Sequence, residues 1–333
     1  MAPLRIGIMG CASIAVRKLL PAMAARPGTE VAAIASRDAG KAADTARGYG
    51  CRAVEGYSAL LDLDDVEAVY LPLPNAAHAE WIERALAAGK HVLAEKPLTT
   101  SVSRTRELIA AAWSAGLVLM ENVMFLHHGQ HVAVRKLLAD GVIGELRAFH
   151  AAFAVPARPP GDIRHRADLG GGALLDTGVY PVRAAMSFLG SEIEVVSAVL
   201  TRRHGHPVDS AGQALLCTGD GVGASATFGI DHAYRSGYEL WGSEGRLVLD
   251  HAFTPPAGHV PVLRLERNTG VEEIPLPPDD QVANTLDAFA AAVRSGRLPD
   301  NDDVLRQAVL VDDIRTKARL HVDHATEPGG IRS

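Results

Sequence analysis

The first 122 residues alternate short apolar runs with longer stretches in which apolar residues recur at helical spacing. Apolar runs bounded by turn-forming residues predict buried strands, and the stretches between them predict helices. Strands that alternate with helices are typical of a doubly wound parallel sheet, so residues 1–122 predict an α/β domain. The predicted strands are Leu4–Gly10, Glu30–Ala35, Arg52–Val54, Glu67–Leu73, His91–Ala94 and Leu117–Met120.

The pattern changes after residue 122. A helix is predicted over His127–Asp140, and apolar and polar residues then alternate along a series of short segments. This alternation is typical of antiparallel strands, so residues 123–325 predict an α+β domain with a large, mostly antiparallel open sheet. Two closing helices are predicted over Gln281–Ser295 and Asp302–Leu320, and the polar last dozen residues are expected to be disordered. The predicted strands are Glu145–Val155, Glu192–Arg203, Gln213–Thr218, Val222–Ile230, Tyr238–Trp241, Arg246–Asp250, Val262–Arg267 and Val271–Ile274.

The composition narrows the class of protein. With 333 residues, of which 47% are hydrophobic, the chain is long enough for about two domains with full cores. The net charge is -6, and no basic run indicates binding to nucleic acid or to an anionic membrane. No apolar stretch approaches the roughly 18 residues of a membrane helix, and the first strand begins too early to leave room for a signal peptide. Three cysteines without a spacing pattern fit reduced thiols, so a cytoplasmic location is expected.

The junction after the first strand carries a degraded form of the dinucleotide-binding fingerprint G-x-G-x-x-G. Gly10 can make the tight turn, Ala12 still allows a close backbone approach, and Ala15 permits tight packing of the next helix on the strand. The N-terminus of that helix would face the pyrophosphate of a dinucleotide. The cofactor-binding residues expected here are Gly10, Cys11, Ala12, Ser13 and Ile14.

The end of the second strand, Ser36-Arg37, is where a dinucleotide enzyme reads the adenosine ribose. An acidic residue there would accept a hydrogen bond from the 2′-hydroxyl of NAD, whereas a serine and an arginine suit the 2′-phosphate of NADP. Asp38 follows directly and weakens the argument, and a solvated Arg37 is the alternative. We therefore expect the cofactor to be NADP, used as NADPH.

Further polar residues follow later strands of the first domain. Asn75 and His78 come after the strand Glu67–Leu73, so we expect them at the carboxyl edge of the sheet, beside the cofactor groove. The alternative for His78 is a helical residue with a purely local hydrogen bond. The other residues expected to line the cofactor groove are Leu73, Pro74, Glu95, Lys96 and Asn122.

The tripeptide Glu95-Lys96-Pro97 closes the apolar run His91–Ala94. A lysine at the carboxyl end of a strand sits where open α/β sheets bind ligands, and the ring of Pro97 keeps Lys96 out of the helical region. The alternative is a surface lysine that merely terminates a strand. The Lys96–Pro97 bond is a candidate cis peptide, because a ligand-facing lysine held by proline is a turn in which cis bonds persist.

A predicted helix after Gly170-Gly171-Gly172 interrupts the strands of the second domain. Asp176 and Tyr180 are four residues apart, so both side chains project from one face of it, and Pro181 distorts the helix just beyond the tyrosine. The three glycines allow a close backbone approach to a ligand. The alternative is a buried core tyrosine with a satisfied hydroxyl, which does not easily explain the aspartate on the same face.

His127 and His131 lie on one helical face at a spacing that metal sites use. There is no glutamate between them and no obvious third ligand. We therefore expect no metal site, and a polar cluster is the preferred interpretation.

Together, the glycine-containing start, Glu95-Lys96-Pro97 and the segment Gly171–Tyr180 resemble the glucose–fructose oxidoreductase / inositol dehydrogenase (Gfo/Idh/MocA) family over essentially the whole chain. Residues 120–131 and 161–164 look most like NDP-hexose 3-ketoreductases of deoxysugar biosynthesis. The resemblance implies a Rossmann domain, a carboxyl-terminal domain with an open sheet, and a sugar carbonyl flanked by Lys96 and Tyr180. Inositol dehydrogenases carry a histidine where this chain has Tyr180, which favours the ketoreductases or dihydrodiol dehydrogenase-like relatives.

The chemistry of ketone reduction fits these residues independently. The reaction needs a hydride on carbon, which a nicotinamide cofactor supplies, and a proton on oxygen. Tyr180 can donate that proton and Lys96 can stabilise the developing alkoxide, while Asp176 completes the expected catalytic set. The alternatives are a dihydrodiol or aldose dehydrogenase of the same family, or a sugar or dinucleotide sensor that does not turn over.

The expected substrate is a dTDP-linked keto-deoxyhexose, reduced at C3, and its sugar part rests on the resemblance. A diphosphate needs cations, and Arg158, Arg164 and Arg166 precede the glycine triplet in a loop that can supply them. A solvated basic loop is the alternative. The expected substrate-binding residues are Lys96, Phe125, Arg158, Arg164, Asp176 and Tyr180.

The second sheet has predicted helices on one side only. Its other face carries alternating Val, Leu, Ala and Phe residues. Because an apolar open face of that size usually meets a partner, we expect a homodimer or homotetramer built on this sheet.

Overall fold

The computed structural model describes residues 2–323. Of the last dozen residues, which were expected to be disordered, Val322 and Asp323 belong to a strand, and the others lie outside the described residues. The chain forms two compact units, Met1–His128 with Asp280–Leu305 (unit 1) and Gly129–Asp279 with Arg306–Ser333 (unit 2). Residues 123–325 were expected to form one domain, whereas the segment Asp280–Leu305 belongs with the amino-terminal residues. No helix among the described residues is long and apolar enough to cross a membrane.

Unit 1 contains a six-stranded parallel sheet in the order β3-β2-β1-β4-β5-β6, which confirms the predicted doubly wound domain. The strands of this sheet are short and, apart from the edge strand β3, mostly buried, as expected for a parallel sheet covered on both faces. The strands are β1 (Leu4–Met9), β2 (Thr29–Ser36), β3 (Arg52–Glu55), β4 (Ala68–Leu71), β5 (His91–Glu95) and β6 (Leu119–Asn122).

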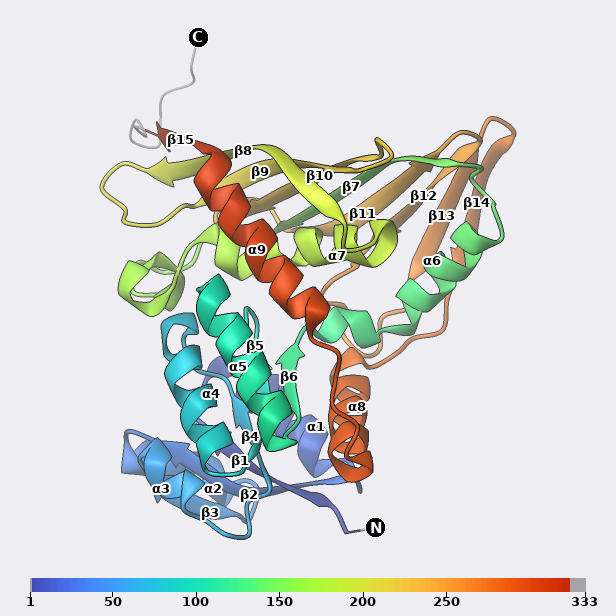
Figure 1. Cartoon of the computed structure of the whole chain (residues 1–333). Helices are drawn as coiled ribbons and strands as arrows, with labels where there is room; N and C mark the ends of the chain where they lie inside the picture. Colours follow the sequence, from blue (N-terminus) through green and yellow to red (C-terminus); the bar gives the residue numbers. More distant parts are fainter. Residues whose placement is uncertain (1, 324–333) are drawn as a thin grey trace. The chain divides into compact units, whose positions relative to one another are not determined.

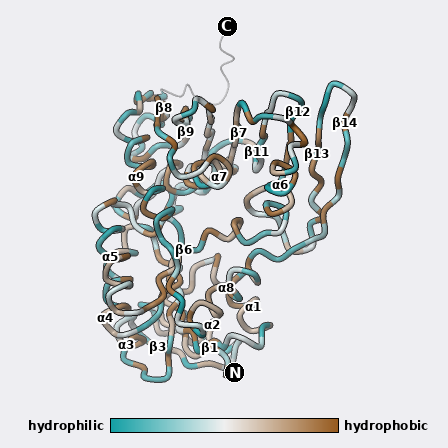
Figure 2. The backbone as a smooth tube through the Cα atoms, turned by 45° about the vertical axis from the view of Figure 1, so that its right-hand side comes forward, coloured by the Kyte–Doolittle hydropathy of each residue, from teal (hydrophilic) through white to brown (hydrophobic). Residues whose placement is uncertain are grey.

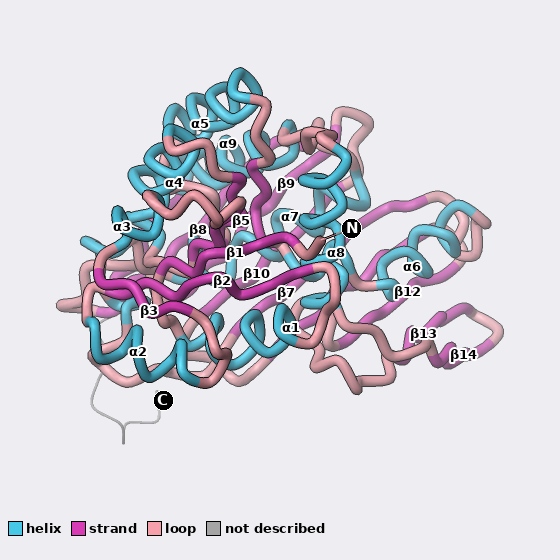
Figure 3. Tube along the Cα trace, turned by 90° about the horizontal axis from the view of Figure 1, so that it is seen from below, coloured by secondary structure: helices cyan, strands magenta, loops and turns pink. Residues whose placement is uncertain are grey.

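Helices cover both faces of this sheet (Figure 3). On one face, α3, α4 and α5 contribute to an apolar cluster with residues of the strands. On the other face, α1, α2 and α8 do the same, and Leu286 and Phe289 of α8 are fully buried there. The helices are α1 (Leu20–Ala24), which continues a π-helical turn at Ala15–Leu19, α2 (Ala39–Arg47), α3 (Tyr57–Leu61), α4 (His78–Ala87), α5 (Val102–Ala115) and α8 (Gln281–Ser295).

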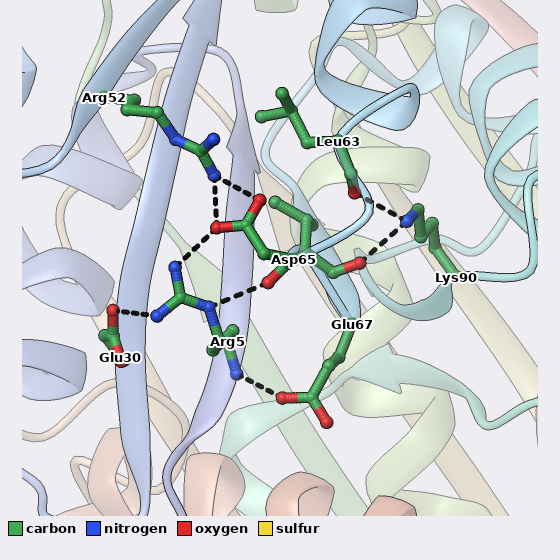
Figure 4. A network of polar contacts seen from close by, with 8 residues as sticks. Arg5, Glu30, Arg52, Leu63, Asp65, Glu67 and Lys90 are labelled. Atoms are coloured by element: carbon green, nitrogen blue, oxygen red, sulfur yellow. Dashed lines mark hydrogen bonds and ion pairs between the residues drawn. The ribbon is translucent and has the colours of Figure 1, made fainter.

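A polar network ties together the strands of unit 1 around Arg5 and the turn before β4 (Figure 4). The Arg5 guanidinium binds Glu30 of β2 at 2.5 Å and Asp65 at 2.7 Å, and Arg52 of β3 also binds Asp65. Arg52 and Arg5 lower the pKa of the Asp65 carboxyl to about 2. Lys90 donates to the carbonyl oxygens of Leu63 and Val66, so the same turn is also held from its other side.

Unit 2 contains a nine-stranded sheet in the order β14-β13-β12-β11-β7-β10-β9-β8-β15. It is mostly antiparallel, as predicted, with parallel pairing only where β10 meets β7 and β15 meets β8. The tube coloured by hydropathy changes between brown and teal along β13 and β14 (Figure 2). The strands are β7 (Leu146–Ala154), β8 (Ile193–Arg203), β9 (Ala211–Thr218), β10 (Gly223–Gly229), β11 (Arg235–Gly242), β12 (Gly245–Asp250), β13 (Val262–Arg267), β14 (Gly270–Pro275) and β15 (Ala318–Asp323).

The helix predicted over Asp302–Leu320 is found, but its predicted carboxyl-terminal end is wrong. α9 (Asp302–Lys317) stops at Lys317, and β15 then pairs in parallel with β8. Without β15, β8 would be an edge strand with a row of unpaired backbone groups, and pairing satisfies them. The predicted helix over His127–Asp140 is found as α6 (Gly129–Ala139).

The two faces of this second sheet differ. α7 (Val179–Leu189) and α9 lie along one face (Figure 1), where the Arg183 guanidinium of α7 donates to Gln307 of α9 at 2.6 Å. Val199, Leu215 and Trp241 on three strands of the sheet remain exposed. The same face also carries polar side chains such as His150 and Ser225, which contact each other at 2.8 Å. It is the face on which a homodimer or homotetramer is predicted.

Candidate active site

The turn after β1, where a dinucleotide pyrophosphate is expected, is built on Gly10. Gly10 has a φ of +111°, and a Cβ added there would lie 3.2 Å from Leu73 Cδ2 and 3.5 Å from the Tyr57 hydroxyl. The positive φ favours glycine here, and a Cβ would in addition have to displace the Leu73 side chain by a few tenths of an ångström. Ala15, the last fingerprint position, is fully buried and belongs to the apolar cluster under α1. Around this turn Cys11 is buried, Ala12 and Ile14 are half-buried, and Ser13 is exposed.

The end of β2 presents Arg37 as an exposed side chain after the buried Ser36. The Ser36 hydroxyl accepts from the amide of Asp38, and the Asp38 carboxylate in turn accepts from the amide of Lys41 at 2.9 Å. Asp38 is thus the N-cap of α2, which gives it a structural role that does not compete with an anion beside Arg37.

Tyr57 is a neighbour of this site that the sequence analysis missed. Its ring meets that of Trp81 edge to face at 5.1 Å, and its hydroxyl lies beside Gly10. Burial raises the pKa of the Tyr57 phenol, and the nearby Arg37 opposes this effect. Tyr57 therefore bridges the phosphate turn and the residue expected to read the ribose. No local motif marks it, because it reaches the site from α3.

His78 lies between the turns that follow β4 and β5. It is fully buried, with Nδ1 2.9 Å from the carbonyl oxygen of Pro97 and Nε2 2.9 Å from that of Leu73. Burial lowers the pKa of His78. Its ring thus links the turn at Pro74, where half-buried Asn75 lies, to the turn that carries Lys96, and these bonds are not local to the helix.

The Lys96–Pro97 peptide is cis, which confirms the prediction. Lys96 is half-buried. The preceding Glu95 is fixed by two donors to Oε1, the Tyr70 hydroxyl at 2.7 Å and the Asn122 amide at 2.6 Å. The amide of Leu98 donates to Glu121 at 2.8 Å. Side chains of neighbouring strands therefore hold the side chain that precedes Lys96 and the backbone that follows it.

The predicted pair of unit 2 residues lies at the start of α7. Asp176 is half-buried on a π-helical turn at Leu174–Gly178, and Tyr180 is buried in the first turn of α7. The Tyr180 ring meets Phe153 edge to face at 4.7 Å and lies 5.7 Å from the Phe253 ring. Single π-helical turns are frequent at functional sites, and this one carries Asp176 and leads directly into the first turn of α7, which carries Tyr180.

The three loop arginines have different surroundings. Arg164 donates through Nε to Asp176 at 2.5 Å and pairs through Nη1 with Asp162 at 3.2 Å. Burial opposes the charge of Arg164, but Asp176 and Asp162 together raise its pKa. Arg166 pairs with Asp168, and Arg158 is exposed. The structure thus joins Arg164 to the expected catalytic aspartate, a contact that the sequence analysis did not foresee.

The remaining expected residues can be placed in their own units. Phe125 is buried in a 3₁₀ turn at Met124–His127 of unit 1. Both ring nitrogens of His131 make hydrogen bonds. Nδ1 lies 2.8 Å from the Tyr238 hydroxyl, and Nε2 lies 3.0 Å from the carbonyl oxygen of Ala252. Among residues 2–323, no group of three or more His, Cys, Asp or Glu side chains could hold a metal ion.

The structure fits a bound dinucleotide in unit 1. The glycine turn cannot accept a Cβ without crowding Leu73, and the side-chain oxygen of Asn122 is buried without a hydrogen-bond partner within the described part of the chain. Both features lie at the carboxyl ends of β1 and β6, where ligands bind in open parallel sheets.

Comparison with known proteins defines the class. Residues 4–123 match the model of the oxidoreductase family with an NAD-binding Rossmann fold (GFO_IDH_MocA), and residues 131–248 match the GFO/IDH/MocA C-terminal domain. The chain therefore belongs to the GFO/IDH/MocA oxidoreductase family.

Within that family, the chain is similar to sugar 3-reductases. It is 55% identical over 319 residues to a dTDP-3,4-didehydro-2,6-dideoxy-alpha-D-glucose 3-reductase of Actinomadura kijaniata, covering 95% of this chain and 96% of the relative. The solved structure of a 3-ketoreductase from Actinomadura kijaniata, in complex with NADP and TDP-benzene, matches with a TM-score of 0.95 and 54% identity over 96% of this chain and 99% of that one. A trans-1,2-dihydrobenzene-1,2-diol dehydrogenase of Oryctolagus cuniculus is 34% identical over 254 residues, covering 75% of this chain and 74% of the relative.

Proposed function

We propose that this protein uses NADPH to reduce the C3 keto group of a dTDP-linked keto-deoxyhexose in deoxysugar biosynthesis. The observation that carries the proposal is the 55% identity to a sugar 3-reductase, in a chain that has Lys96 directly after β5 of unit 1 and Tyr180 in the first turn of α7 of unit 2. The dihydrodiol dehydrogenase relative is less similar and covers less of the chain, so it supports the alternative reaction less well.

The residues divide the chemistry between them. NADPH, when bound, supplies the hydride that adds to the keto carbon. Tyr180 gives the phenolic proton to the keto oxygen, so that the alcohol forms and the proton is replaced from solvent. Lys96 holds a positive charge where negative charge develops on that oxygen. Because the phenoxide left on Tyr180 is also an anion, the same ammonium group favours the proton transfer.

Asp176 and Arg164 have a supporting place in this proposal. Their ion pair at 2.5 Å fixes the aspartate, and Arg164 remains half-buried between two carboxylates. Arg158, which is exposed, is the freer candidate for the substrate diphosphate. Phe125 completes the set of residues that we propose to bind substrate.

The cofactor residues follow from the turns described above. We propose that Gly10, Cys11, Ala12, Ser13 and Ile14 face the pyrophosphate, and that Ser36 and Arg37 face the 2′-phosphate. Leu73, Pro74, Asn75, Glu95, Lys96 and Asn122 would line the groove, with His78 bracing two of its turns from behind. We also propose a cytoplasmic enzyme, because the three cysteines are free thiols.

The test is consumption of NADPH by the purified protein with dTDP-3,4-didehydro-2,6-dideoxy-alpha-D-glucose, followed by absorbance and by identification of the reduced sugar. The free sugar without its nucleotide should lose kcat as well as affinity, because remote binding energy positions the carbonyl. Equal kcat/KM for both would move the enzyme to the free-sugar or dihydrodiol reaction. NADPH binding without consumption would instead favour the sensor.

A further inference from the structure

The helix that carries Asp176 and Tyr180 starts without a cap from its own segment. Neither the π-helical turn at Leu174–Gly178 nor α7 has a side chain that accepts from its first amides. Free N–H groups at a helix start need acceptors. In this helix Asp209, which lies 35 residues after Leu174, provides these acceptors.

Asp209 accepts hydrogen bonds from two successive backbone amides at this helix start. Its carboxylate Oδ2 accepts from the amide of Leu174 at 2.7 Å, and its backbone carbonyl oxygen accepts from the amide of Ala173 at 2.9 Å. Asp209 lies just before β9, so it joins the helix start to the sheet of unit 2. Burial raises the pKa of the Asp209 carboxyl, and Arg315 opposes this.

Two glycines make this contact possible. Gly172 has a φ of +111°, and a Cβ there would overlap Oδ1 of Asp209. A Cβ on Gly171 would lie 2.5 Å from the carbonyl oxygen of Arg164, which instead accepts from the amide of Gly172 at 2.9 Å. The glycines therefore allow a close approach to the chain itself, whereas the sequence analysis assigned that approach to a ligand.

The contact connects to both residues expected to carry the reaction. The loop that packs on Gly171 contains Arg164, whose guanidinium binds Asp176. Tyr180 follows one turn further along the helix that Asp209 holds at its start. A change in where the helix begins would therefore move the carboxylate and the phenol together.

We propose that Asp209 is a positioning residue that fixes the start and rotation of the helix bearing Asp176 and Tyr180. It acts through the amides of Ala173 and Leu174. The inference rests on the proposed reductase function, because its purpose is to place the proton donor.

The test compares Asp209→Ala, Asp209→Asn and a control, Asp231→Asn. Asp231 lines the same small cavity as Asp209, but its carboxylate pairs with Arg203 and His232. Asp209→Ala should lower kcat by about 10-fold to 100-fold, since small misplacements of reacting groups cost on this scale. Its KM for NADPH should stay unchanged, because the cofactor residues belong to unit 1.

Asp209→Asn should recover part of the lost kcat, because an amide oxygen can still accept from Leu174. Asp231→Asn should behave like wild type. Wild-type kcat in Asp209→Ala would overturn the inference, and so would an equal loss in Asp231→Asn. A loss in Asp209→Ala that is not recovered by Asp209→Asn, and that comes with a lower melting temperature in both, would indicate a merely structural role and would also overturn it.

A readout that needs no substrate separates this inference from the proposed function. Amide hydrogen exchange in residues 172–180 should be faster in Asp209→Ala and unchanged in Asp231→Asn. If the wild-type protein consumes no NADPH with the dTDP sugar, the proposed function fails. Amide hydrogen exchange alone then tests whether Asp209 fixes the start of the helix. Equal protection of these amides from exchange in wild type and in Asp209→Ala would overturn the inference that Asp209 fixes the start of the helix.

Discussion

Lys96 and Tyr180 are the residues on which turnover should depend most directly. Lys96→Ala removes the positive charge beside the developing alkoxide, and Tyr180→Phe removes the proton donor while keeping the ring that packs on Phe153. Each substitution should lower kcat by about 10²-fold or more. NADPH binding, followed by the fluorescence of the reduced nicotinamide, should be nearly intact. Wild-type turnover in both variants would contradict the proposed roles.

Arg37 should decide between the two nicotinamide cofactors. Its guanidinium is exposed at the end of β2 and lies near Tyr57. Arg37→Ala should raise the KM for NADPH by about 10-fold and leave that for NADH nearly unchanged, because only NADPH carries the 2′-phosphate. Steady-state kinetics with both cofactors measures this. Arg47, exposed on α2, offers a control whose replacement by alanine should change neither value.

His78 should make stability depend on pH. Burial lowers its pKa in the folded state below the ordinary value of 6.5, so the unfolded chain takes up a proton first as the pH falls. The stability that His78 contributes is therefore present above about pH 6.5 and is lost as the pH falls through the lower, folded-state pKa. In His78→Gln the free energy of unfolding should fall less steeply between about pH 7 and pH 5, as measured by denaturant titration. The exposed His232 provides the control, and an unchanged slope in His78→Gln would contradict the prediction.

At the scale of elements, the regular periodicities were sufficient for most of the fold. The parallel strands of unit 1 and the first eight strands of the second sheet follow from short buried runs and from alternation. β15 did not follow, because its pairing with β8 is a long-range contact that no local pattern encodes. The bond from the Leu174 amide to Asp209 and the approach of Tyr57 to Gly10 were missed for the same reason. The π-helical turn before Tyr180 was missed because the local pattern there predicts only a helix.

α8 should be required for the stability of unit 1. Phe289 is fully buried in the apolar cluster that α8 shares with α1 and the strands. Phe289→Ala should lower the free energy of unfolding by about 3–5 kcal/mol, because it removes a large side chain and leaves a cavity. Val132, which is 59% exposed on α6, is the control, and its replacement by alanine should have little effect. Equal denaturation midpoints for both variants would contradict this placement of α8.

For the whole molecule, we predict a homodimer or homotetramer built on the exposed face of the nine-stranded sheet. Leu215 is 45% exposed on β9, which lies between β10 and β8 in the strand order. Leu215→Glu should reduce the molecular mass measured by light scattering to that of a monomer, because a charge would have to be buried at the interface. Val260, an exposed loop residue, offers Val260→Glu as a control that should keep the wild-type mass. A monomeric wild-type protein at micromolar concentration would rule out this assembly.

The division of the chain into units has a consequence for how the protein is made. Unit 1 takes its first residues from Met1–His128 and its last helix from Asp280–Leu305, with unit 2 sequence between them. During synthesis, the apolar surface that Leu286 and Phe289 later cover must therefore wait until most of the chain has left the ribosome. A fragment that ends near residue 128 should expose that surface and aggregate, whereas the same fragment joined by a short linker to residues 280–305 should be the smallest piece able to bind NADPH.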